Sequence, residues 1–247
     1  MTGLVRAELL KLRATRTTWL LLGTALLIVL GVLVIVLALF DRGGRVTDED
    51  LGGLFSFTAI ADLLVLSLGI VGAAGEFRHG TITAAFLVTP ARWPVIIAKA
   101  LAYALAGAAY ALTTTVLCAA LALPWLAIKD ADFDIAGAAW LQAVAGRCVY
   151  GAMIAALGVG IGTLLRNQAA ALVAALVFLL AIEPALGAVS DVVATYGLNG
   201  AALAIFGATD TGVADVLPFG GGIALYLGYV ALFLGAGIAL TLTRDVS

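Results

Sequence analysis

The chain is organised as long apolar runs separated by short segments that carry most of its charged residues. Six runs stand out, at about 18–40, 54–74, 98–123, 138–165, 168–188 and 217–242. A helix needs about 20 predominantly apolar residues to cross the hydrocarbon core of a bilayer, and each run meets that length. Strands of a membrane barrel would instead read as alternating segments of roughly 10 residues. Because a membrane helix satisfies its own backbone hydrogen bonds, the pattern predicts six transmembrane helices.

The predicted fold class is all-α, a polytopic membrane protein in which residues 1–247 form a single transmembrane domain. The segment 189–216 is less regular, and its Asn199-Gly200 pair is typical of a turn. We interpret this segment as short re-entrant or external helices between spans five and six. We also expect the third span to end near Pro124. The fifth is expected to break at Glu183, since proline biases the preceding residue away from helix.

Basic residues divide unevenly between the two sides that six spans define. One side would hold nine of the 13 Lys and Arg residues, namely Arg6, Lys11, Arg13, Arg16, Arg78, Arg92, Lys99, Arg166 and Arg244. The other side would hold Arg42, Arg45 and Lys129. Cytoplasmic loops carry the excess of Lys and Arg. We therefore expect a multi-pass protein of the cell (inner or plasma) membrane with both termini in the cytoplasm.

Composition narrows the function classes. The chain is 64% hydrophobic and 11% charged, whereas a soluble domain has about 25% charged residues. The high hydrophobic fraction disfavours a soluble enzyme. The net charge of −2 does not indicate a basic surface of the kind that binds nucleic acid. Cys118 and Cys148 fall inside apolar runs, so we expect buried thiols rather than a disulfide framework.

Catalytic and metal-binding patterns are missing. A phosphate-binding loop needs Gly-Lys followed by Ser or Thr, but Lys11, Lys99 and Lys129 follow Leu, Ala and Ile. One histidine and two separated cysteines do not make a metal cluster. The acids at 130–134 lack the glycine and distal glutamate of a calcium loop, which favours a solvated acidic loop. We therefore expect no enzyme activity, metal or cofactor in this chain itself.

Three charged residues lie well inside the predicted spans, away from the first two residues of each: Asp62, Arg147 and Glu183. A charge at mid-bilayer costs about 2.5–3.5 kcal/mol on insertion scales, so each needs a reason. Asp62 and Arg147 both fall near mid-depth, and we expect them to pair. The alternative is a polar patch that lines a substrate route. Glu183, near the outer face, would sit at an external gate or reach water at the headgroups.

The connection between spans two and three carries a motif. It reads Glu76-Phe77-Arg78-His79-Gly80-Thr81-Ile82, with Thr89-Pro90 and Arg92 following. The N-terminus reads Arg6-Ala7-Glu8-Leu9-Leu10-Lys11-Leu12-Arg13, and Trp19 opens span one. Together with the layout of six spans, these segments resemble the permease (membrane-spanning) subunits of ABC transporters of the type-2 exporter class.

The resemblance implies an ATP-driven exporter in which the permease pairs with a separate ATP-binding subunit that holds ATP and Mg. A second permease copy or a sister permease would complete the transporter, so that ATP hydrolysis takes place on the partner chain. Residues Glu76–Phe86 would form a cytoplasmic coupling helix, with Glu76, Phe77, Arg78, His79, Gly80, Thr81 and Ile82 coupling to the ATPase. The N-terminal segment would be an interface helix on the inner leaflet, carrying Arg6, Glu8, Lys11 and Arg13.

Some alternatives stay open. Glu8 falls within the apolar arc of Leu4, Val5, Leu9 and Leu12, so it would face the partner or pair with Lys11 or a nearby arginine. The segment could also be a simple juxtamembrane flank. A self-sufficient secondary transporter would need inverted repeats and ion ligands in mid-span, which the sequence does not display. An intramembrane lipid-modifying enzyme would need a denser catalytic set. Neither the transported substrate nor the choice between homodimer and heterodimer can be read from the residues.

Overall fold

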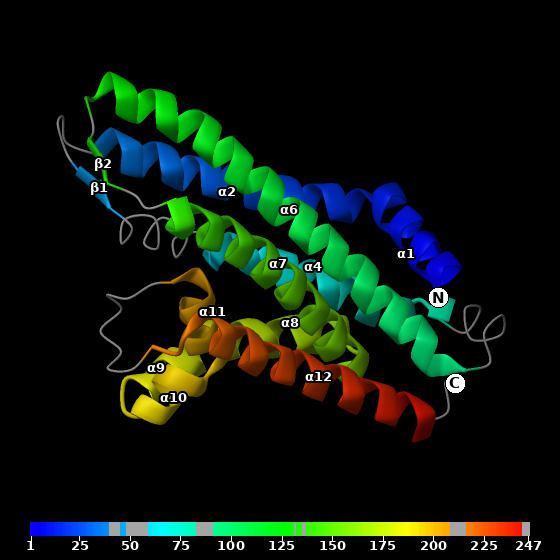
Figure 1. Ribbon diagram of the computed structural model, residues 1–247. Coiled ribbons are helices and arrows are strands. Elements are labelled where there is room, and N and C mark those ends of the chain that lie inside the picture. Colours follow the sequence, from blue (N-terminus) through cyan, green and yellow to red (C-terminus); the bar gives the residue numbers. More distant parts are fainter. Residues whose placement is uncertain are drawn as a thin grey trace.

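The computed structural model describes residues 1–39, 45–47, 59–82, 91–130, 132–134, 137–207 and 216–243. Within these ranges the chain is a bundle of helices (Figure 1). The longer helices are α1 (Thr2–Ala14), α2 (Arg16–Leu39), α4 (Ala59–Arg78), α6 (Arg92–Ile128), α7 (Gly137–Leu165) and α12 (Phe219–Thr243). The shorter elements are α8 (Gln168–Val177), the π-helix η1 (Phe178–Ile182), α9 (Glu183–Gly187), α10 (Asp191–Tyr196) and α11 (Leu198–Phe206).

Five of these helical segments are long and apolar enough to cross a membrane. They are α2, α6, residues Trp140–Leu165 of α7, the continuous stretch Gln168–Gly187 and α12. The chain is therefore a polytopic helical protein suited to a bilayer. Helix α4 is not among the five, since its 20 residues include three charged ones, Asp62, Glu76 and Arg78.

Helix α7 is the centre of the bundle and packs against α4, α6, α11 and α12 (Figure 1). Two thirds (67%) of its apolar window is buried, whereas the corresponding figure is 22% for α2 and α6. The outer helices accordingly expose large apolar side chains such as Leu20 and Leu27. In water such a surface would be unstable, but in a bilayer it faces lipid tails.

Glycines allow α7 to approach its neighbours closely. A Cβ built on Gly158 would lie 2.3 Å from the Leu66 carbonyl oxygen of α4, and one on Gly69 2.3 Å from the Ala155 oxygen. Across the α6–α7 contact, a Cβ on Gly107 would lie 2.0 Å from the Gly151 oxygen. Small residues at such crossings allow close van der Waals packing between membrane helices. Membrane helices rely on this packing because the hydrophobic effect does not drive helices together in lipid.

Two expectations about proline are wrong. Helix α6 does not end near Pro124 but continues to Ile128, since a membrane helix tolerates a single lost backbone hydrogen bond. The fifth span does not break at Glu183, whose φ of −64° and ψ of −46° are helical. The π-helical turn ends at Ile182, two residues before Pro184, and its wider spacing relieves the clash that the proline ring would otherwise make with the carbonyl four residues earlier.

The structure also adds elements that the sequence did not predict. Strands β1 (Arg45–Thr47) and β2 (Asp132–Asp134) pair in parallel, with Val46 opposite Phe133. The pair joins the end of α2 to the end of α6. Between spans five and six the predicted short helices are present as α10 and α11, and seven residues of α11 are buried against the bundle.

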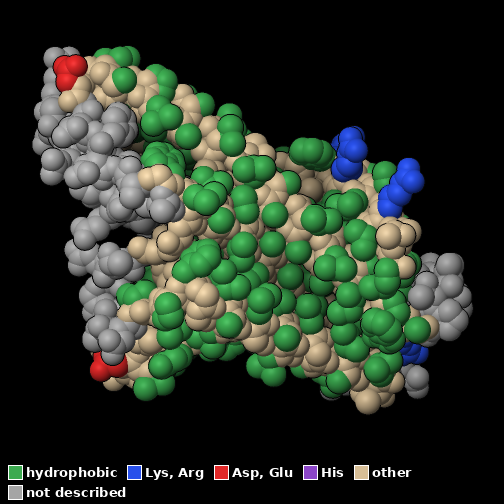
Figure 2. Space-filling model, in the orientation of Figure 1, with side chains coloured by type: hydrophobic (Ala, Val, Ile, Leu, Met, Phe, Trp, Pro, Cys, Tyr) green, Lys and Arg blue, Asp and Glu red, His purple; other side chains and the backbone are tan. Residues whose placement is uncertain are grey.

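The charged side chains visible on the surface in Figure 2 lie at the two ends of the molecule. Figure 2 shows Lys and Arg side chains at the end where α1 lies, Asp and Glu side chains at the opposite end, and an apolar waist between them. The C-terminal end of α12 lies at the α1 end (Figure 1). Both ends of the described chain therefore lie at the basic end of the bundle.

Candidate functional site

The predicted pairing of Asp62 with Arg147 is present. The two guanidinium nitrogens of Arg147 donate to the two carboxylate oxygens of Asp62 at 2.5 and 2.7 Å. Both residues are almost fully buried, at 0% and 1% exposure, and the guanidinium carbon lies 5.6 Å from the ring centroid of Phe206. A bidentate geometry satisfies both charges. This pair joins α4 to α7 and offers no open polar surface to a substrate.

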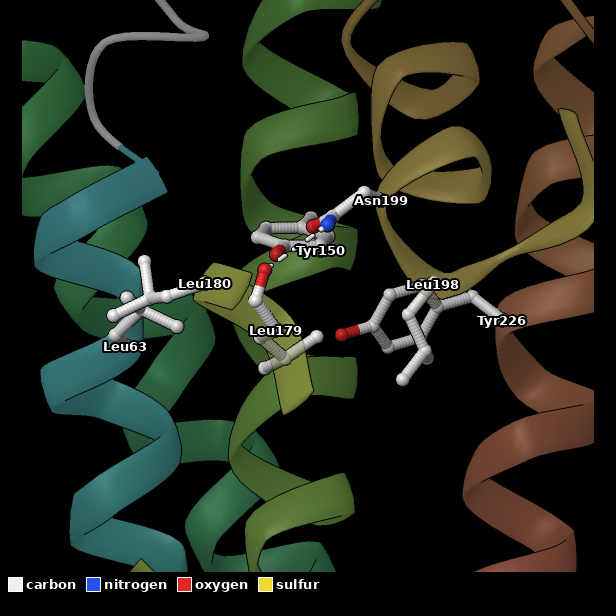
Figure 3. Close-up of a pocket in the computed structure, with 7 residues that line it drawn as sticks. All are labelled: Leu63, Tyr150, Leu179, Leu180, Leu198, Asn199 and Tyr226. Carbon is white, nitrogen blue, oxygen red and sulfur yellow. Dashed lines mark hydrogen bonds between the residues drawn. The ribbon is translucent and has the colours of Figure 1, made fainter. Parts of the chain in front are cut away.

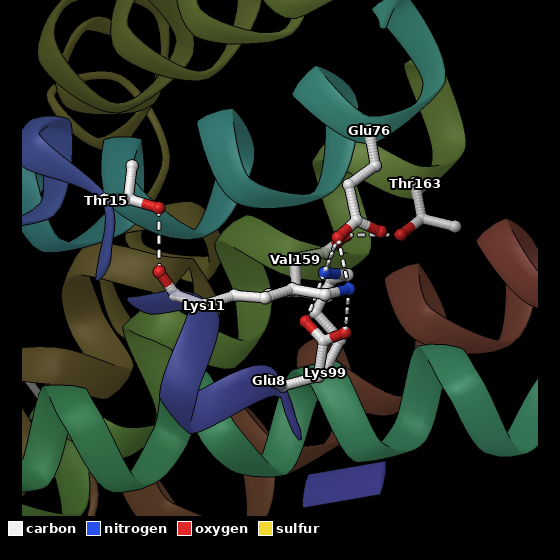
Figure 4. Close-up of polar contacts among 7 residues, drawn as sticks. All are labelled: Glu8, Lys11, Thr15, Glu76, Lys99, Val159 and Thr163. Atoms are coloured by element: carbon white, nitrogen blue, oxygen red, sulfur yellow. Dashed lines mark hydrogen bonds and ion pairs between the residues drawn. The ribbon is translucent and has the colours of Figure 1, made fainter. Parts of the chain in front are cut away.

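A second set of charges lies at the basic end of the bundle (Figure 4). Glu8 of α1, Lys11 of α1, Glu76 of α4 and Lys99 of α6 form a network, which we call the four-charge network. Lys99 Nζ lies 2.5 Å from Glu8 Oε2 and 2.9 Å from Glu76 Oε1. Lys11 Nζ lies 2.6 Å from Glu8 Oε1 and 2.9 Å from Glu76 Oε1. Each lysine thus contacts both carboxylates, and three helices are connected.

Burial differs across this network. Glu8 and Lys99 are buried, with side chains 6% and 4% exposed, whereas the Lys11 side chain is half exposed. Partial burial would lower the pKa of Lys11, but its hydrogen bonds to Glu8 and Glu76 outweigh that effect and the net shift is upward. Glu76 contacts both Lys99 and Lys11, whose ammonium groups balance its charge. The network therefore holds two positive and two negative groups in mutual contact.

The N-terminal segment is a separate helix, which packs along α6, while Arg6 and Arg13 are exposed on it. The predicted contact between Glu8 and Lys11 is confirmed. Sequence reasoning missed Lys99, which it treated only as a positive residue on the cytoplasmic side. The available signal was its place inside the third apolar run, because a lysine entering a membrane helix needs a carboxylate partner.

The predicted coupling segment is not one helix from Glu76 to Phe86. Helix α4 continues through Arg78, and the chain then turns at His79 and Gly80, where Gly80 has a φ of +68° that favours glycine. Glu76 and Phe77 are half-buried, and Phe77 lies 5.0 Å below the guanidinium of Arg166. Residues 83–90, including Phe86, lie outside the described residues.

The rest of the segment divides by exposure. Arg78, His79, Gly80 and Thr81 are exposed, and we call these four residues the exposed turn. Ile82, directly after it, is buried. Within the described part of the segment, residues 76–82, the exposed turn is the part placed to meet another protein, while Glu76 acts inside the chain through the four-charge network.

Glu183 caps a helix rather than reaching the surface. It is 3% exposed, and its Oε1 accepts the backbone N–H of Asn199, in the first turn of α11, at 2.7 Å. A carboxylate at that position satisfies an unpaired donor of the helix end. Its Oε2 has no hydrogen-bond partner among the described residues. The side chain therefore does not extend to water at the headgroups.

A small cavity lies between α4, α7, η1, α11 and α12 (Figure 3). Its volume is about 90 Å³. The lining residues are Leu63, Tyr150, Leu179, Leu180, Leu198, Asn199 and Tyr226. The Asn199 side-chain amide donates to the Leu179 carbonyl oxygen at 3.2 Å, which ties α11 to the π-helical turn. The cavity is too small for a large substrate, but it places polar groups deep in the bundle.

Other candidate chemistry is sparse. Within the described ranges, Cys118 and Cys148 are free of a disulfide, but they are half-buried rather than buried as predicted. His, Cys, Asp and Glu form no cluster there that could hold a metal ion. The acidic strand Asp132–Asp134 is described only by its backbone pairing.

Comparisons of the chain with protein-family models, with curated proteins and with solved structures found no match. The case for a function therefore depends on the geometry of these sites and on the sequence motifs.

Proposed function

We propose that this chain is the permease subunit of an ATP-driven ABC exporter. It would form the substrate pathway with a second permease and couple to a separate ATP-binding subunit, which holds ATP and Mg. The observation that carries the proposal is the four-charge network, because it ties the N-terminal helix to the base of the exposed turn. Movement of a partner bound at that end would thereby reach α4 and α6 directly.

In this proposal α4 is the sixth membrane span. Its 20 residues give about 30 Å of helix, which matches the hydrocarbon core. Its charges do not oppose insertion, since Arg147 neutralises Asp62 and the two lysines neutralise Glu76 near the end of the helix. Six spans then leave both termini in the cytoplasm, at the basic end, in agreement with the positive-inside rule.

The exposed turn is the proposed contact for the ATP-binding subunit. It joins the end of α4 to the segment that leads into α6, and Arg78 gives it a positive charge on the cytoplasmic side. The helix α1, with Arg6 and Arg13 exposed, would lie along the inner leaflet, where its basic side chains meet anionic headgroups.

Purification of the tagged chain from its native membrane tests the proposal. We expect a protein with a phosphate-binding loop to copurify, and the reconstituted complex to hydrolyse ATP. Arg78→Ala should lower that hydrolysis several-fold while the amount of chain in the membrane stays unchanged. Arg16→Ala is the matched control, since Arg16 is also exposed at this end but lies outside the turn and the network.

Transport by the purified chain alone, driven by an ion gradient and without any ATP-binding protein, would overturn the proposal. A secondary transporter would then be the function. One observation favours that second candidate: Glu183 is a buried carboxyl with no cationic partner among the described residues, as proton-coupled carriers require.

A further inference from the structure

Two of the buried carboxyls, those of Asp62 and Glu183, have opposite surroundings. Asp62 receives two hydrogen bonds from the guanidinium of Arg147. Glu183 is also enclosed, at 3% exposure, but it accepts only backbone N–H groups, those of Leu198 and Asn199, and its Oε2 has no hydrogen-bond partner among the described residues. Burying an ionised carboxylate without a counter-charge costs far more than burying the neutral acid. We propose that Glu183 is a proton-binding site, neutral in this conformation, whereas Asp62 is ionised.

The groups around Glu183 support this assignment. On α7 and α12 the nearby titratable side chains are the hydroxyls of Tyr150, Tyr226 and Tyr229, which are neutral near pH 7. On α10 they are Asp191 and Tyr196, both exposed, and η1 and α11 contain no titratable residue. None of these groups is a cation, so the proton is the charge-balancing ligand that the described site can hold.

The cavity gives the proton a way to exchange. Asn199 lines the cavity with its side chain and donates its backbone N–H to Glu183, so the carboxyl is one hydrogen bond from the cavity wall. A volume of about 90 Å³ has room for several water molecules, because one water needs roughly 10–15 Å³ of such a cavity. Tyr150, Tyr226 and Asn199 offer such waters polar partners (Figure 3). Leu180, on the same wall, is exposed at the surface of the bundle.

A hydrophobic carbodiimide tests the proposal on the full chain in membranes. A protonated carboxyl adds across one N=C bond of the reagent: its oxygen bonds to the central carbon and its proton moves to a nitrogen, so the adduct contains the whole reagent. Dicyclohexylcarbodiimide should label Glu183, as read by mass spectrometry of the peptides, and labelling should fall as pH rises. Asp62, in the same molecule, is the matched control and should stay unlabelled.

Glu183→Gln and Asp62→Asn give a second measurement that does not depend on reagent access. Gln keeps an acceptor for the Asn199 N–H and is as neutral as the protonated acid, so Glu183→Gln should leave the melting temperature unchanged. Asp62→Asn leaves Arg147 buried without its counter-charge and should lower it clearly. A large loss of stability in Glu183→Gln, or a Glu183 that resists labelling while Asp62 reacts, would overturn the proposal. Neither result depends on an ATP-binding partner, so this test is independent of the proposed transport function.

Discussion

Lys99 and Glu8 are 91 residues apart in the chain, and their side chains form a salt bridge of 2.5 Å inside the bundle. The same lysine lies 2.9 Å from Glu76. Lys99, at the start of the third apolar run, thus attaches both the N-terminal helix α1 and helix α4 to α6. How much this salt bridge stabilises the fold depends on burial. An exposed ion pair adds little to the free energy of unfolding, whereas removing one partner of a buried pair lowers it strongly.

We predict that Lys99→Met detaches α1 from the bundle, while Lys11→Met does not. Lys99 is 3% exposed, so its loss leaves two carboxylates short of a buried counter-charge, at a cost of about 3–5 kcal/mol. The Lys11 side chain is half exposed, and its loss should be small. Limited proteolysis at the N-terminus measures the difference. Equal cleavage of the two variants would contradict this role for Lys99.

Exchanging the partners tests the pair in the centre of the bundle. Asp62→Asn or Arg147→Gln alone should cost about 3–5 kcal/mol, because each leaves one buried charge unpaired. The double exchange Asp62→Arg with Arg147→Asp should recover part of the expression lost in the single variants Asp62→Arg and Arg147→Asp. The yield of folded protein in detergent is the measurement, and failure of the double variant to exceed both single ones would count against the pair as a stabilising contact.

Helix packing gives a prediction at Gly158. A methyl group there would meet the Leu66 carbonyl oxygen of α4 at 2.3 Å, so Gly158→Ala should separate the helices and cost about 1–3 kcal/mol. Gly228→Ala on α12 is the control, since a Cβ at that position meets nothing within 4 Å. Thermal unfolding in detergent compares the two variants, and a Gly158→Ala protein as stable as the control would show that the crossing can relax.

Sidedness can be measured with single cysteines. Thr15→Cys, at the α1 end, should react with a membrane-impermeant maleimide only after the membrane is opened, whereas Asp130→Cys should react in intact cells. Both positions are exposed in the structure. Cys118 and Cys148 are replaced by Ala to remove background labelling. Reaction of both positions from the outside would mean that the number of spans between them is even.

Hydropathy and charge predicted much of this fold because a bilayer constrains the sequence so strongly. Apolar runs located the helices, and the pairing of Asp62 with Arg147 followed from the cost of charge at mid-depth. The wrong predictions concerned the two prolines, because the rules applied to them describe helices in water. Proline tends to end helices in water, but here α6 continues through Pro124 and a π-helical turn precedes Pro184.

The candidate site was predicted less completely. Glu8 was expected to pair with Lys11, yet its buried partner Lys99 lies far along the chain, and no local pattern connects the two. Glu76 was assigned to a contact with another protein, whereas its carboxylate points into the chain. Long-range side-chain pairing of this kind depends on how the helices cross, which the order of residues alone does not specify.

The glycine crossings and the Asp62–Arg147 pair have a mechanical consequence. The backbones of α4 and α7 are in close contact at the glycines, and two charged hydrogen bonds link the same helices, so α4 and α7 should move as one rigid unit. Close-packed contacts transmit displacement rather than absorb it. Because Glu76 belongs to α4, a displacement of α1 would be transmitted through it to α4 and α7 together.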